Sequence, residues 1–151
     1  MAKTNKIEVG IAGEFLVASK LSELGFAVGL TRKNTPGIDI LVSNGKKAKI
    51  IQVKTTEGPK NEWICPIPER AEEDLYYVFV NLNRKGDAQD AVPSYHVLSS
   101  KAVKTFLDKM KKECGAAFEE KHGRPFTGRE LFKFIDSGSA HKDKWDILDL
   151  G

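Results

Sequence analysis

The sequence lacks the features that would place it in a membrane or in an oxidising compartment. No apolar run approaches the roughly 18 residues that a membrane-spanning helix requires. The opening residues, MAKTNKIEVGIAGE, are too polar for a secretory signal peptide, and the only cysteines, Cys65 and Cys114, are far apart. We therefore expect a reducing, cytoplasmic location and no membrane partner.

Motifs of several enzyme classes are also missing. There is no glycine-rich phosphate loop and no GxSxG elbow, which argues against an NTPase and a serine hydrolase. No internal repeat or low-complexity tract occurs, and the cysteine spacing fits no zinc motif. A disulfide, or a zinc site that also uses His96, His122 or His141, is the less favoured alternative for the cysteines.

Charged residues are plentiful but nearly balanced. The 151 residues carry a net charge of +3, with 30% charged and 40% hydrophobic residues, as is ordinary for one globular domain. Residues 32–60 hold more basic than acidic side chains, the basic ones being Arg32, Lys33, Lys46, Lys47, Lys49, Lys54 and Lys60. This excess fits a polyanionic partner, although lysines that keep a hairpin edge solvated would give the same pattern.

Two segments rich in β-branched residues predict a β-hairpin over residues 34–56. Asn44-Gly45 lies between them and favours a type I′ turn, because both central residues of that turn need positive φ. With these two residues as the turn, Ser43 lies opposite Lys46, and this pair sets the register of the hairpin.

Three polar side chains should meet on one face of this hairpin. The register places Asp39 opposite Ile50, and residues two apart along a strand share a face. Asp39, Gln52 and Lys54 are therefore expected on the same side, with Asp39 and Gln52 as diagonal neighbours about 7 Å apart. The alternative is a cross-strand salt bridge with an amide neighbour on a solvated face.

The segment Pro36–Asp39 followed by Gln52–Lys54 resembles the active-site motif of the PD-(D/E)xK nuclease superfamily, which includes many restriction endonucleases. Glu14, on a predicted helix, matches an acidic residue that these nucleases often carry on their first helix. The sequence departs from the common pattern at Gln52, where Glu or Asp is usual. Gln at this position (QxK) is found in branches that resemble the Mrr-type restriction enzymes.

The resemblance implies hydrolysis of phosphodiester bonds with Mg²⁺ (or Mn²⁺). Asp39 would be the main ligand, Gln52 and the backbone carbonyl of Val53 would add neutral oxygens, and Glu14 would bind through water or hold a second ion. Lys54 would orient the attacking water or stabilise the pentacovalent phosphate. Gln in place of Glu removes one negative charge, which should weaken metal binding and favours a single metal ion.

Further residues near the motif are candidates for nucleic-acid contacts. Arg32 and Lys33 precede Asp39 and would clamp the phosphate backbone, and Thr55 and Thr56 would donate hydroxyl hydrogen bonds. The two threonines would equally serve to satisfy the end of the strand. Glu14 has an alternative role as a helix-flank partner in a salt bridge.

The order of the elements predicts an α/β fold. A helix over residues 7–24 should bury an apolar stripe, namely Ile7, Ile11, Phe15, Ala18, Leu21 and Leu24. Strands follow at 26–31, in the hairpin, at 75–82 and at 93–98. The strand at 75–82 is the most apolar and is therefore expected to be central. A helix capped by Ser99 or Ser100 then runs to about residue 112. Together with the resemblance, this order predicts a restriction-endonuclease-like core with a central mixed β-sheet flanked by helices.

The remaining residues are expected to form a C-terminal helical extension, so that 1–114 is the core domain and 115–151 packs on it or on a partner. A capping box at 127–130 should open a short helix, ELFKFID. The function expected from the resemblance is a DNA endonuclease of restriction or repair type, with a homodimer as one way to gain specificity. The alternatives are an inactive nuclease-fold module that binds nucleic acid or a protein, and a subunit of a toxin or defence assembly.

Overall fold

The structure, a computed structural model, describes residues 5–32, 36–84, 91–127 and 132–151. A five-stranded sheet in the order β1-β2-β3-β5-β6 lies at its centre. β3 and β5 run parallel and the other neighbours antiparallel, so the sheet is mixed. Its strands are β1 (Ala27–Leu30), β2 (Ile40–Ser43), β3 (Ala48–Thr56), β5 (Leu75–Asn81) and β6 (Ser94–Ser99).

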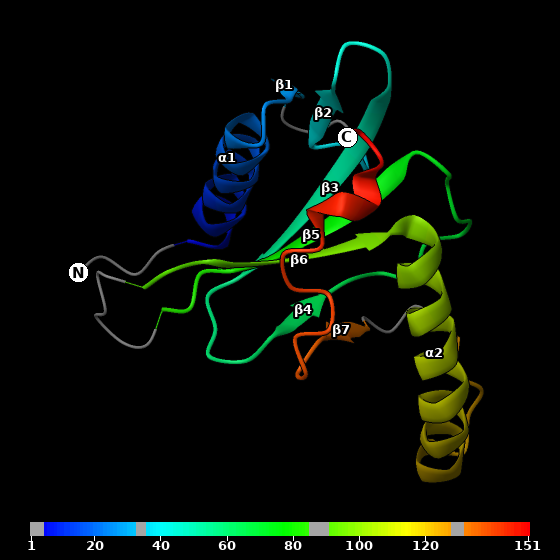
Figure 1. Cartoon of the computed structure of the whole chain (residues 1–151). Helices are drawn as coiled ribbons and strands as arrows, with labels where there is room; N and C mark the ends of the chain where they lie inside the picture. The colour runs from blue at the N-terminus through cyan, green and yellow to red at the C-terminus, as the bar shows by residue number, and fades with distance from the viewer. Residues whose placement is uncertain (1–4, 33–35, 85–90, 128–131) are drawn as a thin grey trace.

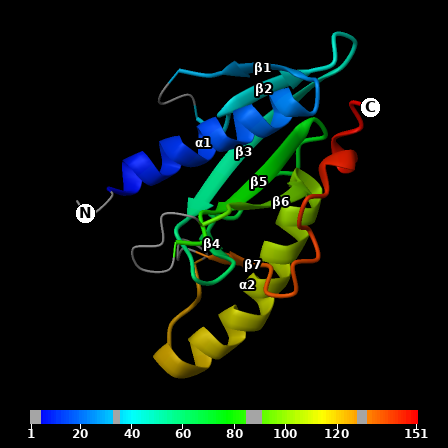
Figure 2. The ribbon, with the colours of Figure 1, turned by 60° about the vertical axis from the view of Figure 1, so that its left-hand side comes forward.

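One layer covers each face of this sheet (Figures 1 and 2). Helix α1 (Lys6–Glu23) and the short 3-10 helix η1 (Trp145–Leu148) pack on one face. The other face holds helix α2 (Ser100–His122) and a two-stranded sheet of β4 (Glu62–Ile64) and β7 (Lys133–Ile135). The expected α/β fold with a mixed sheet between helices is confirmed. Within the described ranges, no helix is long and apolar enough to cross a membrane.

The strand predicted to be central is β5, and every one of its residues is buried. It lies between β3 and β6, and both of its faces are covered by helical or sheet layers. A strand that pairs in parallel and is covered on both faces needs a continuous apolar sequence, which LYYVFV supplies.

The prediction of which side of α1 is buried is wrong. The helix buries Val9, Gly13, Val17 and Leu21 against the sheet. Most of the predicted stripe is exposed instead, namely Ile7, Ile11, Phe15 and Leu24. The cause is Gly13, which lies so close to Thr55 on β3 that a Cβ there would overlap the threonine hydroxyl. The small residue, and not the bulkiest stripe, selects the side that meets the sheet.

The hairpin of β2 and β3 forms with a register two residues away from the predicted one. Ser43 pairs with Ala48, because the connection has four residues, 44–47, in place of two. Asn44 Oδ1 accepts hydrogen bonds from the main-chain N–H groups of Lys46 and Lys47 at 2.9 and 2.8 Å, which stabilises this longer turn. A shift of two residues leaves each side chain on its predicted face.

The C-terminal part differs more from the prediction. α2 continues through Gly115 to His122, so the boundary predicted at residue 115 falls within a helix. The capping box predicted at 127–130 lies largely outside the described residues, and part of the expected ELFKFID helix is the strand β7. Phe134 on β7 pairs with Trp63 on β4 and stacks on Phe79, and these tertiary contacts override the local helix signal.

Candidate active site

Asp39 stands at a bend directly before β2, with its side chain fixed to the backbone of β3. Its main-chain N–H donates to the carbonyl of Ile51 at 3.0 Å, and its Oδ2 accepts a hydrogen bond from the N–H of Val53 at 2.7 Å. The carboxylate therefore lies at the edge of β3, in the position that a carbonyl of a neighbouring strand would occupy. Among the described residues, no hydrogen bond occupies its other oxygen, Oδ1.

This edge of β3 presents a second oxygen beside the Asp39 carboxylate. β2 pairs with β3 only as far as Ile51, so beyond that residue β3 faces the carboxylate in place of a strand. The N–H and C=O of one strand residue point to the same side, so the carbonyl of Val53 points toward Asp39 as its N–H does. A carboxylate oxygen and a backbone carbonyl thus face the same gap.

Gln52 and Lys54 share a face of β3, as the predicted alternation requires. They are opposite Tyr77 and Phe79 in the parallel register with β5, on the face that α2 and the β4–β7 sheet cover. Both side chains are half-buried, and neither makes a hydrogen bond or ion pair within the described part of the chain. Burial raises the pKa of the Cys65 thiol to about 11, and the nearby Lys54 ammonium opposes this rise.

A cavity of about 460 Å³ opens next to Gln52. Its walls come from segments 36–38 and 68–72, and Ile50, Gln52 and Tyr77 form part of its floor. The cavity therefore lies between the residues that lead into Asp39 and the strand that carries Lys54. Neither Asp39 nor Lys54 lines it, so Gln52 is the side chain that joins it to the candidate site.

Glu14 and Thr55 approach the same end of β3 from the opposite face of the sheet. Glu14 is half-buried on α1 and follows Gly13, which lies against Thr55. The hydroxyl of Thr55 is buried beneath α1 and has no hydrogen-bond partner in the residues that the structure describes. This placement does not leave the Thr55 hydroxyl open to a phosphate, whereas Thr56 is half-buried on the same face as Lys54.

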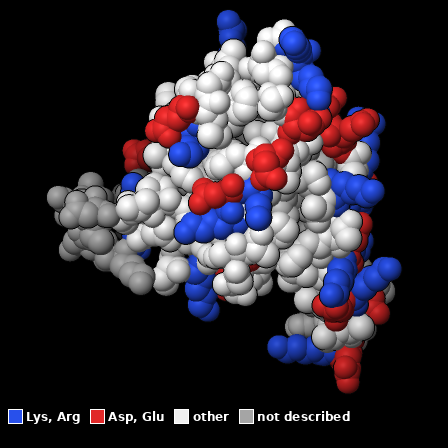
Figure 3. Space-filling model, in the orientation of Figure 1, with Lys and Arg blue, Asp and Glu red and all other residues white. Residues whose placement is uncertain are grey.

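The basic excess of residues 32–60 is partly neutralised in three dimensions. Lys47 pairs with Asp149 and Lys49 with Asp74, each at 2.7 Å. On the face seen in Figure 3, basic and acidic side chains are interspersed, and neither sign covers a continuous area. Arg32 is exposed two residues after the end of β1, and Lys33 lies outside the described residues.

The oxygens at the β3 edge suit a hard divalent cation, although they are few. Mg²⁺ prefers oxygen ligands, keeps several waters and is often held by one or two carboxylates together with substrate phosphates. The described residues include no group of three or more His, Cys, Asp or Glu side chains that could hold a metal ion. The residues present therefore fit a cation bound by Asp39 and Val53 and completed by water and substrate.

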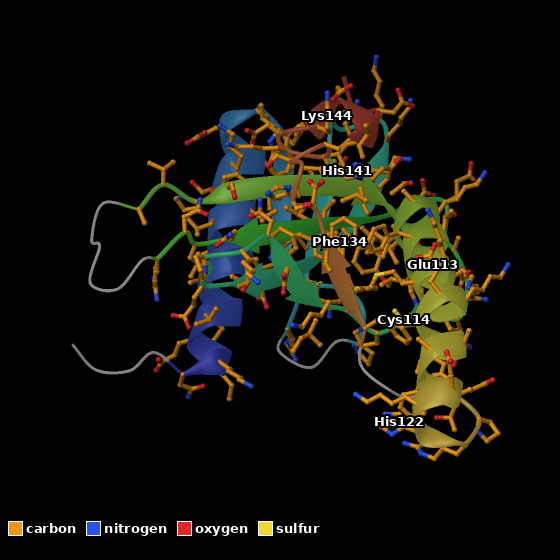
Figure 4. All side chains as sticks on the ribbon, turned by 90° about the horizontal axis from the view of Figure 1, so that it is seen from below. Glu113, Cys114, His122, Phe134, His141 and Lys144 are labelled. Carbon is orange, nitrogen blue, oxygen red and sulfur yellow. The ribbon has the colours of Figure 1, made fainter. Side chains whose placement is uncertain are left out.

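The histidines and cysteines form no further metal site in the described residues. Cys65 is buried and Cys114 is exposed on α2, and both are free thiols. Figure 4 shows Cys114 and His122 along α2, separate from His141. The less favoured alternative of a disulfide or a zinc site finds no support among the described residues.

Sequence reasoning missed a buried line of Ser94, His96 and Asp136 next to β7. His96 Nδ1 lies 2.6 Å from Asp136 Oδ2, and Ser94 Oγ lies 3.4 Å from His96 Nε2. All three are buried, and His96 is 0% exposed, so no substrate reaches them. Asp136 also accepts hydrogen bonds from the N–H groups of Ala140 and His141, and the group fastens this segment to the sheet.

Comparisons with known proteins point to one structure. A scan against protein-family models gives no match, and a search of curated proteins gives none. Among solved structures, the chain is similar to that of a bacterial homing endonuclease, I-Ssp6803I, with a TM-score of 0.55 and 10% sequence identity. The likeness covers 99% of this chain and 95% of that one. At this identity the likeness shows the fold alone.

Proposed function

We propose that the chain is a metal-dependent nuclease of the PD-(D/E)xK type, with DNA as its substrate. The observation that carries this proposal is an anchored carboxylate, Asp39, at the edge of β3, together with two polar side chains of that strand, Gln52 and Lys54, that have no partner among the described residues. A half-buried ammonium without a counter-charge is costly, unless a bound anion completes its surroundings. Lys54 has no counter-charge among the described residues, and it lies two residues from Gln52 and next to the strand edge that holds Asp39. The likeness to an endonuclease fold supports the same reading.

In this proposal each side chain has a defined task. The Lys54 ammonium donates a hydrogen bond to a non-bridging oxygen of the phosphate and offsets the charge that develops there. The hydrogen bond from Val53 holds the Asp39 carboxylate in one orientation, with Oδ1 directed away from the backbone. Asp39, the Val53 carbonyl and Gln52 would hold Mg²⁺ or Mn²⁺, with Glu14 acting through water. The cation would supply Lewis acidity at the phosphate.

The test is nicking of a supercoiled plasmid with Mg²⁺ or Mn²⁺. Lys54→Ala and Asp39→Ala should each lower the rate about 100-fold or more. Lys49→Ala is the matched control, because Lys49 lies on the same strand but is paired with Asp74 away from the site. Cleavage that survives both site substitutions, or a chelator, would show that these residues are not the active site.

A second candidate function is a nuclease-fold module that binds nucleic acid without cutting it. The observation in its favour is that the β3 edge offers one carboxylate, with Gln52 where a second is usual. This candidate predicts DNA binding that weakens with salt and responds little to Mg²⁺. Gln52→Glu should then be compared with the wild type for cleavage, and activity in neither protein favours the binding module.

A further inference from the structure

The cavity beside Gln52 has a lining that differs from that of a phosphate site. Apolar side chains, among them Pro36, Ile38, Pro68 and Leu75, form its walls. Arg70 is the one basic residue among the described residues of the lining, and its Nε lies 3.8 Å from the Glu72 carboxylate. Within the part of the lining that the structure describes, Glu69, Arg70 and Glu72 sum to one negative charge, which disfavours an anion inside the cavity.

Two polar groups on the floor are available to a neutral ligand. The Gln52 amide and the Tyr77 hydroxyl make no hydrogen bond to any described residue, and both line the cavity. Burial, with the nearby Cys65 and Glu72, raises the pKa of Tyr77 to about 12, so its hydroxyl stays a neutral donor. Apolar lining residues beside one amide and one hydroxyl suit a heterocycle that carries donors and acceptors on its edge.

The volume of the cavity limits how much substrate can enter. At about 460 Å³ it lies within the roughly 300–1,000 Å³ of sites that hold one small molecule. A base that is paired and stacked in a duplex cannot enter such a space, whereas a base that has left the stack can. The position of Gln52, two residues before Lys54, places such a base next to the phosphate of the proposed nuclease site.

We infer that this cavity binds a single unpaired nucleobase of the substrate, with adenine preferred. The inference rests on the proposed function and names its substrate class: a nucleic acid with an unpaired or flipped-out base. A glutamine amide pairs with both N6 and N7 of adenine, and the carboxylates of Glu69 and Glu72 accept from an exocyclic amino group. The Gln52 amide oxygen has two lone pairs, so it would accept from N6 and also face the cation, while its NH₂ donates to N7. Glu cannot combine these roles, because a carboxylate has no donor.

The experiment compares binding of fluorescein-labelled oligo(dA) and oligo(dT), each of about 20 nucleotides, by anisotropy in the presence of a chelator. The wild type should bind oligo(dA) at least about tenfold more tightly, the lower range expected for one bidentate base contact. Gln52→Glu and Tyr77→Phe, both nearly isosteric, should bring this ratio close to one. Lys54→Ala should weaken both oligonucleotides by the same factor, because a phosphate contact carries no base information.

The outcomes separate this inference from the proposed function. Equal binding of the two oligonucleotides by the wild type, or a preference that persists in both floor variants, overturns the base site and leaves the nuclease proposal intact. An unchanged affinity in Lys54→Ala counts against the proposed function alone. No binding of either oligonucleotide by the folded wild type overturns both.

Discussion

Two glycines of α1 provide a sharp test of how this helix meets the sheet. Gly10 and Gly13 lie in the same helix, where alanine is favoured over glycine by about 1 kcal/mol. A Cβ at Gly10 would meet nothing within 4 Å, so Gly10→Ala should stabilise the protein by about 1 kcal/mol. A Cβ at Gly13 would overlap the Thr55 hydroxyl and lie 3.0 Å from the Cβ and Cγ2 of the same residue.

The cost at Gly13 should exceed the gain in helix propensity. Overpacking costs about 1–3 kcal/mol, and a β-branched residue on a central strand has little freedom to move away. With a cost near the upper end of that range, Gly13→Ala should destabilise the protein by about 2 kcal/mol, a difference of about 3 kcal/mol from Gly10→Ala. In a domain of this size, the melting temperature should then rise by about 2–4 °C in Gly10→Ala and fall by about 4–8 °C in Gly13→Ala.

Thermal and urea denaturation, followed by circular dichroism, would measure both effects. The double variant Gly13→Ala/Thr55→Ala removes the overlapping atoms and should recover part of the loss, beyond the sum of the single effects. Equal shifts in the two glycine variants would refute the close contact between α1 and β3. The same result would favour the orientation predicted from the sequence, in which the bulky apolar stripe of α1 faces the sheet.

Two further stability predictions concern a buried hydrogen bond between a carboxylate and an imidazole, and an exposed ion pair. Asp136→Asn should cost about 1.5–3 kcal/mol in urea denaturation at pH 7, because it removes a charged partner from buried His96. Burial would raise the pKa of Asp136, but hydrogen bonds from His96, His141 and Ala140 hold it below the usual 3.8. Wild-type stability should therefore fall as the pH drops from about 4 through this lowered pKa, and a constant difference between the proteins would contradict the assignment. Lys47→Ala, which breaks an exposed ion pair with Asp149, should leave the urea midpoint close to that of the wild type at 0.15 M salt, and a clear loss of stability would be inconsistent with the exposure of the pair.

The hairpin shows what sequence could and could not provide. β-branched runs and alternation predicted which residues form β2 and β3, and which side chains share a face. The turn length was missed, because the side-chain hydrogen bonds of Asn44 favour a four-residue connection over the two-residue one that Asn-Gly suggests. The error did not move Gln52 or Lys54 to the other face, since it amounted to two residues.

The remaining errors have tertiary causes. Hydrophobic periodicity could not choose between the two apolar sides of α1, because the choice depends on the contact of Gly13 with Thr55. The strand around Phe134 depends on aromatic stacking with Phe79 and Trp63, which no local signal encodes. The cavity was not predictable for the same reason, because its walls and floor come from segments that are separate in the sequence.

The pairing of β4 with β7 has a consequence for how the protein opens and closes. Trp63 and Phe134 are about 70 residues apart, so this small sheet closes a much longer loop than the hairpin does. Closing a loop of that length costs chain entropy before its strand contacts can stabilise the protein. Short strands also open more readily than a central parallel pair. Amide protons of β4 and β7 should therefore exchange with solvent before those of β3 and β5. Such openings would expose the stacked rings of Trp63, Phe79 and Phe134 while the central sheet stays intact.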